Sequence, residues 1–193
     1  MSKKELIIFD FFGVISSEIA PIWLRKYFDE ETSKTIKRDI VSQVDIGEIS
    51  EEELYIKLGD LAKLTPEKVK NEWEKLVIIN TELTDFIRSI KNNYLIALLS
   101  NASETFLRKI LDKYSLYDLF DTIVISSEEK IVKPNEEIYN IVLNRLDIKP
   151  EKALMIDDNI NNINGSKEAG IEGIIYNDFK KFKKEFEIKT KAS

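Results

Sequence analysis

Four groups of polar side chains in this chain of 193 residues each follow a short apolar run, and their residue types belong to one kind of chemistry. In chain order the groups are Asp10, then Ser100 with Asn101, then Lys133, then Asp157 with Asp158. A carboxylate can attack phosphorus and hold the phosphoryl group as an aspartyl phosphate. A bound cation offsets the repulsion between the two anions, while lysine and hydroxyl groups hold the remaining phosphate oxygens. These residues in this order therefore indicate phosphoryl transfer.

The composition removes most competing chemistries. The chain contains no cysteine and no histidine, which excludes thiolate nucleophiles, zinc–thiolate sites, Ser-His-Asp triads and histidine general bases. Proton transfer must then come from Asp, Glu, Lys or Tyr. A metal site must be built from oxygen ligands, and such ligands suit Mg²⁺.

Each of these positions also has a purely structural explanation. An Asp at the end of a strand is often a turn residue, Ser100 with Asn101 can cap a following helix, and a single lysine is usually a surface residue. Asp157 and Asp158 are adjacent carboxylates, which repel each other unless a cation or hydrogen bonds relieve them. The combination, with each group after a predicted strand, favours the functional interpretation.

The elements that must position these groups form an α/β pattern. Apolar runs typical of buried parallel strands occupy residues 6–9, 95–99, 122–125, 153–156 and 173–176. Amphipathic stretches over 103–114, 135–146 and 159–169 predict helices between them. This alternation predicts a doubly wound, mostly parallel, Rossmann-like sheet, in which ligands bind beyond the carboxyl ends of the strands.

Residues 16–80 interrupt this alternation. They predict helices over 19–41, 51–63 and 66–77, and no strand run lies among them. Ser50 with Glu53 forms a capping-box pattern, and Thr65 before Pro66 is typical of a helix start. We therefore expect a small all-helical cap at 16–80, inserted after the first strand of a core formed by 1–15 and 81–193.

The ordered motifs resemble the haloacid dehalogenase superfamily of hydrolases over nearly the whole chain. The matching residues are Phe9 to Val14, Leu99 to Asn101, Val132 to Pro134 with Ile138 and Tyr139, and Ile156 to Asp158 with Asn162, Gly165, Ala169 and Gly170. Residues 45–50, with Glu53 and Leu54 after them, resemble the cap segment of the subgroup containing sugar-phosphate phosphatases and epoxide-hydrolase N-terminal domains.

The resemblance implies a Mg²⁺-dependent phosphatase or phosphotransferase that acts on a small phosphorylated metabolite. Asp10 would be the nucleophile and a metal ligand, and the backbone carbonyl of Phe12 would be a second ligand. Asp158 would bind the metal directly, and Asp157 would help through water. Ser100 and the amide of Asn101 would hold the transferred group, and Lys133 would neutralise charge on Asp10 and on the phosphate. Gly13 allows a sharp turn whose amides can cradle phosphate.

Phe12 departs from the family pattern. Phosphatases of the family carry a second Asp at this position, two residues after the nucleophile, and it protonates the leaving group and later activates water. A phenyl ring can do neither, and loss of general acid–base help costs about 10²–10⁴-fold in rate.

Three interpretations of Phe12 remain open. The chain is a phosphatase with impaired acid–base catalysis, in which a carboxylate such as Glu18 substitutes. Alternatively, it is a non-catalytic relative that keeps the metal and phosphate pocket. The third is a 2-haloacid dehalogenase, because those relatives often carry an aromatic residue here. They need no metal, however, so the acidic pair Asp157 and Asp158 speaks against this interpretation.

The charge and the hydropathy of the chain limit the kinds of partner that we expect. The net charge of −6 and the pI near 5.0 disfavour a nucleic-acid binder. No run approaches the roughly 18 apolar residues of a membrane span, and the apolar run near the N-terminus is too short for a signal peptide, so we expect a cytoplasmic protein. The Lys-rich stretch 180–191 predicts a solvated helix with an apolar stripe, and a membrane-surface or partner-binding role is its alternative.

Overall fold

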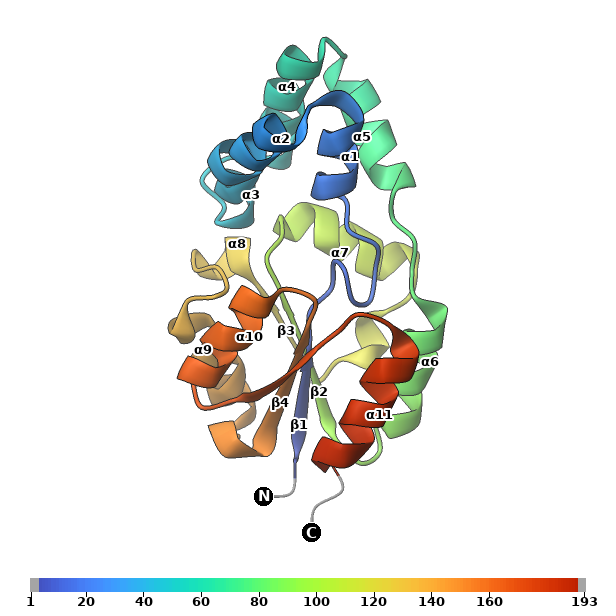
Figure 1. Ribbon diagram of the computed structural model, residues 1–193, viewed down its shortest axis with the longest axis vertical. Helices are drawn as coiled ribbons and strands as arrows, with labels where there is room; N and C mark the ends of the chain where they lie inside the picture. Colours follow the sequence, from blue (N-terminus) through green and yellow to red (C-terminus); the bar gives the residue numbers. More distant parts are fainter. Residues whose placement is uncertain (1–3, 191–193) are drawn as a thin grey trace.

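The computed structural model describes residues 4–190, and within them five strands form one fully parallel sheet (Figure 1). The strands are β1 (Leu6–Phe9), β2 (Leu95–Ser100), β3 (Thr122–Ile125), β4 (Ala153–Asp157) and β5 (Glu172–Ile175). Their order across the sheet is β3-β2-β1-β4-β5, with β1 in the centre. The predicted doubly wound α/β fold is confirmed.

Three strands differ from the prediction by one residue at one or both ends. Strands β2 and β4 extend to include Ser100 and Asp157, because the sheet ladder pairs Ser100 with Ile125 and Asp157 with Ile175. Strand β5 begins and ends one residue earlier than predicted. Two of the polar groups singled out in the sequence are thus the last residues of strands.

Alternation along β1 supplies both halves of the core. Ile7 and Phe9 belong to one buried apolar cluster, and Leu6 and Ile8 belong to a second cluster on the opposite face. Helices α6 (Thr81–Ile90), α7 (Glu104–Lys113) and α11 (Phe179–Thr190) contribute to the first cluster. Helices α9 (Glu136–Leu146) and α10 (Ile160–Glu168) contribute to the second.

The core contains helical elements beyond those that the sequence patterns predicted. Helix α6 fell within the predicted core range without being predicted as a helix. The remaining short elements are the 3₁₀ turns η2 (Tyr117–Leu119) and η3 (Pro150–Lys152) and the helix α8 (Ser126–Glu129). Helix α11 confirms the predicted apolar stripe, since Phe182 and Phe186 are buried against Phe86 at ring-centroid distances of 5.4 and 5.2 Å. Lys191, the last residue of the Lys-rich stretch, lies outside the described residues.

A second group of helices stands beyond the carboxyl ends of the strands (Figure 1). They are α1 (Ala20–Tyr27), α2 (Glu30–Ile36), the π-helical η1 (Lys37–Val41), α3 (Ser42–Asp45), α4 (Glu51–Ala62) and α5 (Pro66–Lys75). We call this group the helical layer. The single helix predicted over 19–41 is wrong. The backbone of Phe28 is extended, and the Asp29 side chain caps the new helix α2 by accepting from the Thr32 amide. The capping box at Ser50 and the cap at Thr65 are confirmed.

The chain enters and leaves the helical layer through two segments that lie side by side. Ser16 forms an antiparallel bridge with Ile79, and the Ser17 amide donates to the Ile78 carbonyl at 3.0 Å. The Asn80 amide donates to the Ile15 carbonyl at 2.9 Å.

Of the helices within residues 4–190, none combines the length and the apolar character needed to cross a membrane.

Candidate functional site

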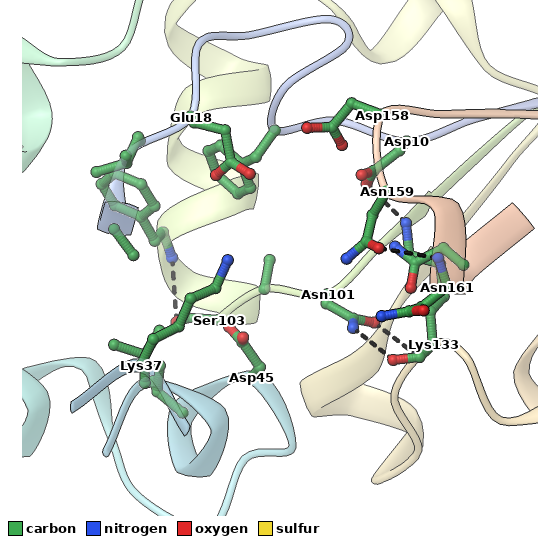
Figure 2. A pocket seen from close by; sticks show the side chains of 18 of the residues that line it. Asp10, Glu18, Lys37, Asp45, Asn101, Ser103, Lys133, Asp158, Asn159 and Asn161 are labelled. Atoms are coloured by element: carbon green, nitrogen blue, oxygen red, sulfur yellow. Dashed lines mark hydrogen bonds and ion pairs between the residues drawn. The ribbon is translucent and has the colours of Figure 1, made fainter. Parts of the chain in front are cut away.

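A cavity of about 510 Å³ separates the helical layer from the carboxyl edge of the sheet, and Figure 2 shows it from close by. The sheet side contributes Asp10, Phe12, Asn101, Lys133 and Asp158 to its wall, all of them predicted site residues. The other predicted site residues, which are Gly13, Ser100 and Asp157, do not line it. The sheet thus brings polar groups from four separate loops to one place.

Lys133 joins the first and last of these groups. Its Nζ lies 2.8 Å from Asp10 Oδ1 and 2.6 Å from Asp157 Oδ2, and all three side chains are buried. Asn101 fixes the Lys133 backbone, since its Oδ1 accepts from the Lys133 amide at 2.8 Å and its Nδ2 donates to the Lys133 carbonyl at 3.0 Å. The position of the ammonium group therefore depends on the loop after β2.

Burial governs the electrostatics of this trio. It raises the pKa of Asp10 well above the usual range of a carboxyl group, Lys133 opposes that shift, and Asp157 and Asp158 reinforce it. Burial alone would lower the pKa of Lys133, but the carboxylates of Asp10 and Asp157 outweigh it and raise the value. Lys133 therefore stays charged, and the site keeps more carboxyl groups than cations.

The two adjacent acids at the end of β4 have different surroundings. The Asp157 carboxylate accepts from Lys133, from Asn162 Nδ2 at 3.0 Å and from the Asn159 amide at 2.8 Å. Asp158 borders the cavity instead. Burial, followed by the charges of Glu18 and Asp157, raises the pKa of Asp158 to about 6. Asp157 is thus held by the protein, whereas Asp158 forms no ion pair within residues 4–190 and feels Lys133 only from a distance.

The three acids fit a hard divalent cation. Asp10, Asp157 and Asp158 each offer a carboxylate oxygen, and these oxygens all lie within 4.8 Å of one another. Oxygen donors with excess negative charge are what Mg²⁺ prefers. Because Asp157 already accepts three hydrogen-bond donors, Asp10 and Asp158 are the better direct ligands.

Gly13 is required by the close approach of Asp158. Its φ is +86°, and a Cβ at this position would stand 2.3 Å from Asp158 Oδ2. We expect Gly13→Ala to destabilise the protein by roughly 1–3 kcal/mol, since it adds strain in the left-handed region. Displacement of Asp158 should also weaken Mg²⁺ binding, and so reduce the increase in melting temperature that Mg²⁺ produces. Thermal unfolding with and without Mg²⁺ measures both effects, and an unchanged Mg²⁺ response would contradict the link to Asp158.

Ser100 presents a buried hydroxyl whose Oγ has no hydrogen-bond partner within residues 4–190. An unsatisfied buried polar atom costs about 1–3 kcal/mol, so a ligand atom that forms a hydrogen bond with Ser100 Oγ would remove this cost. Ser100 ends β2, next to the strand that carries Asp10. Its predicted role toward the transferred group remains a prediction.

Phe12 forms part of the apolar wall of the cavity. Its ring meets Phe11 edge-on at 5.0 Å and stacks on Phe106 at 6.2 Å with an interplanar angle of 17°. The ring is half-buried between these neighbours. The place of an acid–base group next to Asp10 is therefore occupied by a packed aromatic side chain.

The helical layer adds polar residues that the sequence did not single out as site residues. Figure 2 shows Lys37 and Asp45 at the cavity, across from Asp10, and it also shows Glu18, which precedes α1 and which the sequence analysis had named as a possible substitute for the acid–base group. Burial, reinforced by Glu18 and opposed by Lys37 and Lys133, raises the pKa of Asp45 to about 7. The only sequence signal for Asp45 was its place at the start of the segment 45–50.

The raised pKa of Asp45 predicts a pH-dependent stability. Its stabilising contribution is complete below its ordinary pKa of 3.8 and is lost as the pH rises through about 7. Asp45→Asn should therefore increase the free energy of unfolding at pH 8 but not at pH 4. We expect a gain on the order of 1 kcal/mol, less than complete burial would give, because the side chain is half-buried. Urea unfolding at both pH values checks this, and a variant less stable at pH 8 would contradict it.

Comparisons with known proteins agree with this geometry. A phosphorylated carbohydrates phosphatase of Thermotoga maritima is 30% identical over 183 residues, covering 88% of this chain and 83% of the relative. An (S)-2-haloacid dehalogenase of Pseudomonas is 22% identical over 86% of this chain and 73% of its own length.

Solved structures share the fold. A HAD family enzyme of Bacteroides thetaiotaomicron superposes with a TM-score of 0.80 at 22% identity, covering 96% of this chain and 99% of that one. The same enzyme in complex with magnesium and inorganic phosphate gives a TM-score of 0.74 at 21% identity, with coverage of 90% and 94%.

The family model described as haloacid dehalogenase-like hydrolase matches residues 4–170. This range holds every group described above, from Asp10 at the end of β1 to the acidic pair after β4. The chain therefore belongs to the haloacid dehalogenase-like hydrolases.

Proposed function

We propose that this protein is a Mg²⁺-dependent phosphatase or phosphotransferase that cleaves phosphate esters of small metabolites through an aspartyl phosphate on Asp10. The observation that carries the proposal is the buried Asp10–Lys133–Asp157 trio with Asp158 beside it, since Asp10, Lys133 and Asp158 line the cavity. The Thermotoga relative that acts on phosphorylated carbohydrates supports it. So does the magnesium and phosphate complex of the Bacteroides enzyme.

Each residue of the site has a separate role in this proposal. Asp10 attacks phosphorus, and Lys133 holds the attacking carboxylate and offsets charge on the phosphoryl oxygens. In this proposal Ser100 Oγ and the Asn101 amide donate to the same oxygens. Mg²⁺, when bound, would be held by Asp10, Asp158 and the Phe12 carbonyl, with Asp157 acting through water, and would neutralise charge between nucleophile and phosphate.

We also propose that residues 16–80 act as a cap that sets the substrate. The helical layer encloses the cavity from the side opposite Asp10, and its residues differ in chemistry from those at the sheet edge (Figure 2). In this proposal the chemistry stays with the sheet, and recognition of the alcohol part of the ester falls to the inserted helices.

The proposal is tested with a panel of phosphate esters, with and without Mg²⁺, and with ³²P transfer from the same esters. Mg²⁺-dependent release of phosphate together with acid-stable label on Asp10 is the expected result. No hydrolysis and no label with any ester would overturn it. Halide release from a 2-haloacid without Mg²⁺ would instead favour the dehalogenase alternative, for which the Pseudomonas relative provides the precedent.

Phe12 favours a second candidate, a non-catalytic protein that binds metal and phosphate. The variant Phe12→Asp separates the two, because it restores a carboxyl group next to Asp10. A binding protein with an intact scaffold would acquire turnover only in this variant. For a phosphatase we expect turnover in the unmodified chain and an increase with unactivated alkyl phosphates.

A further inference from the structure

Four carboxyl side chains other than Asp10 and Asp158 border the cavity, and they have different surroundings. The four are Glu18, Asp45, Glu51 and Glu168. Glu51 accepts a hydrogen bond from Tyr55 Oη at 2.6 Å, and Glu168 is an exposed residue of α10. Glu18 and Asp45 are half-buried and accept no side-chain hydrogen bond that the described residues record. These two are the carboxyl groups available to a substrate.

Asp45 is fixed to the sheet side by its backbone. The Ser126 hydroxyl donates to the Asp45 carbonyl, and the same Ser126 Oγ accepts from the Ala102 amide at 3.0 Å. Ala102 directly follows Ser100 and Asn101, the residues that we place against the phosphoryl group. Asp45 therefore has a defined position relative to the phosphate, although it belongs to the helical layer.

Gly47 holds the same segment from its other side. Lys130 Nζ donates to the Gly47 carbonyl at 2.8 Å, and the φ of Gly47 is +73°. A Cβ on Gly47 would stand 2.3 Å from Lys130 Nζ and 2.7 Å from the Ser127 carbonyl oxygen. Contacts this close place the end of α3 directly against the β3–α8 region, so Asp45 is held at the wall of the cavity.

The position of Asp45 suits the leaving group. In an in-line displacement, the leaving oxygen stands on the opposite side of phosphorus from the attacking carboxylate. Figure 2 shows Asp45 across the cavity from Asp10. The charged groups that face it are Lys37 on η1, Glu18 on the segment before α1, and Lys133 from the sheet side. Its pKa of about 7 lets both protonation states exist near neutral pH, which suits a group that must donate and then accept a proton.

We propose that Asp45 is the proton donor and acceptor of the reaction, in place of the carboxyl group that Phe12 does not supply. The inference rests on the proposed phosphatase function. In the first step Asp10 forms a bond to phosphorus, the bond from phosphorus to the ester oxygen breaks, and the Asp45 carboxylic acid gives its proton to that oxygen. The alcohol leaves neutral.

In the second step the Asp45 carboxylate accepts a proton from water while the water oxygen attacks the aspartyl phosphate. The bond between Asp10 and phosphorus breaks, which releases inorganic phosphate and the free Asp10 carboxylate. Asp45 ends protonated, as it began. The net reaction is ester plus water to alcohol plus phosphate.

The test compares two esters that differ in their need for a proton. p-Nitrophenyl phosphate releases a stable phenolate, whereas glycerol phosphate releases an alkoxide unless it is protonated. Asp45→Asn should reduce kcat for glycerol phosphate by about 10²–10⁴-fold and kcat for p-nitrophenyl phosphate by about tenfold or less. Asp45→Asn should also remove the loss of glycerol phosphate activity that the unmodified protein shows as the pH rises above about 7.

Two further variants make the comparison specific. Glu48→Gln is the matched control, since Glu48 is an exposed carboxylate of the same segment that does not line the cavity, and both activities should be unchanged. Phe12→Asp added to Asp45→Asn should restore at least tenfold of the lost glycerol phosphate activity, because it returns a carboxyl group to the alternative position.

Each contrary outcome has a distinct meaning. Equal losses on both esters, or a rise in KM with kcat unchanged, would show that Asp45 only binds substrate and would overturn the inference. The inference would also be overturned if Glu18→Gln, and not Asp45→Asn, reduced kcat for glycerol phosphate far more than kcat for p-nitrophenyl phosphate. That result would assign the proton transfer to Glu18. If the unmodified protein hydrolyses neither ester with Mg²⁺, while labelling of Asp10 is also absent, the proposed function itself fails.

Discussion

Asp10→Asn is expected to lower phosphate release by about 10⁴-fold or more and to abolish the covalent label, because an amide oxygen cannot carry the phosphoryl group. The expected loss is larger than that for Asp45→Asn, since removal of the nucleophile affects every ester regardless of its leaving group. Measurement of kcat with p-nitrophenyl phosphate and with glycerol phosphate shows whether both fall together.

The fold of this variant should survive. Asn has the shape of Asp, and burial disfavours the charge on Asp10, so the melting temperature at pH 8 should be equal or higher. Circular dichroism and thermal unfolding provide this control. Hydrolysis within tenfold of the unmodified protein, in a folded Asp10→Asn variant, would contradict the role of Asp10 as nucleophile.

Lys133→Ala is expected to cost about 3–5 kcal/mol of stability, because it leaves two buried carboxyl groups without their shared cation. The Nζ atom contacts Asp10 at 2.8 Å and Asp157 at 2.6 Å, and the lysine side chain has no exposed surface. Without Lys133 the pKa of Asp10 rises further, because the lysine opposes the effect of burial, so the loss should grow as the pH rises and should be small in acid. Urea unfolding at pH 5 and pH 8 measures the effect.

The matched comparison is Lys133→Met, alone and together with Asp10→Asn and Asp157→Asn. Met keeps most of the volume of the lysine side chain, so Lys133→Met isolates the charge. The triple variant removes the unpaired carboxylates and should recover most of the lost stability. A loss below 1 kcal/mol at pH 8 in both single variants would contradict the buried trio. All of these variants should be inactive, because the phosphoryl oxygens lose their cation.

Much of the sheet could be predicted because its strands are continuous apolar runs. β1 and β3 have the predicted bounds, and the others differ by one residue at their ends. The ends of β2 and β4 shifted because Ser100 and Asp157 are polar residues that the hydrogen-bond ladder nevertheless includes. Polarity marks where a side chain can face solvent or a ligand, and it does not mark where backbone pairing stops.

The helical layer was harder to predict. A helical period continues through 19–41, but the extended conformation of Phe28 and the capping side chain of Asp29 divide it. Such a break depends on how α1 packs against α2 and against α5, and the local sequence carries little of that information. Asp45 was missed as a site residue for the same reason, since only the folding of the layer over the sheet brings it to the cavity.

The sequence predicted which residues form the site, but it did not predict which of them contact one another. Chain order placed Asp10, Lys133 and Asp158 at one edge, and the fold confirms that they border the same cavity. The sharing of Lys133 between Asp10 and Asp157 could not be read from spacing, because it depends on the Asn101 side chain that fixes the Lys133 backbone.

The paired segments at the base of the helical layer have a consequence for how such proteins diversify. The chain departs at Ser16 and returns at Ile79, and these two residues are bridged to each other. The sheet therefore needs only a pair of neighbouring attachment points from whatever lies between them. An insert of another length or shape can replace the helical layer at Ser16 and Ile79 if its two ends lie equally close together. The strand order of the sheet then stays the same. The helical layer can in this way be exchanged while Asp10, Lys133 and Asp158 stay in place at the edge of the sheet.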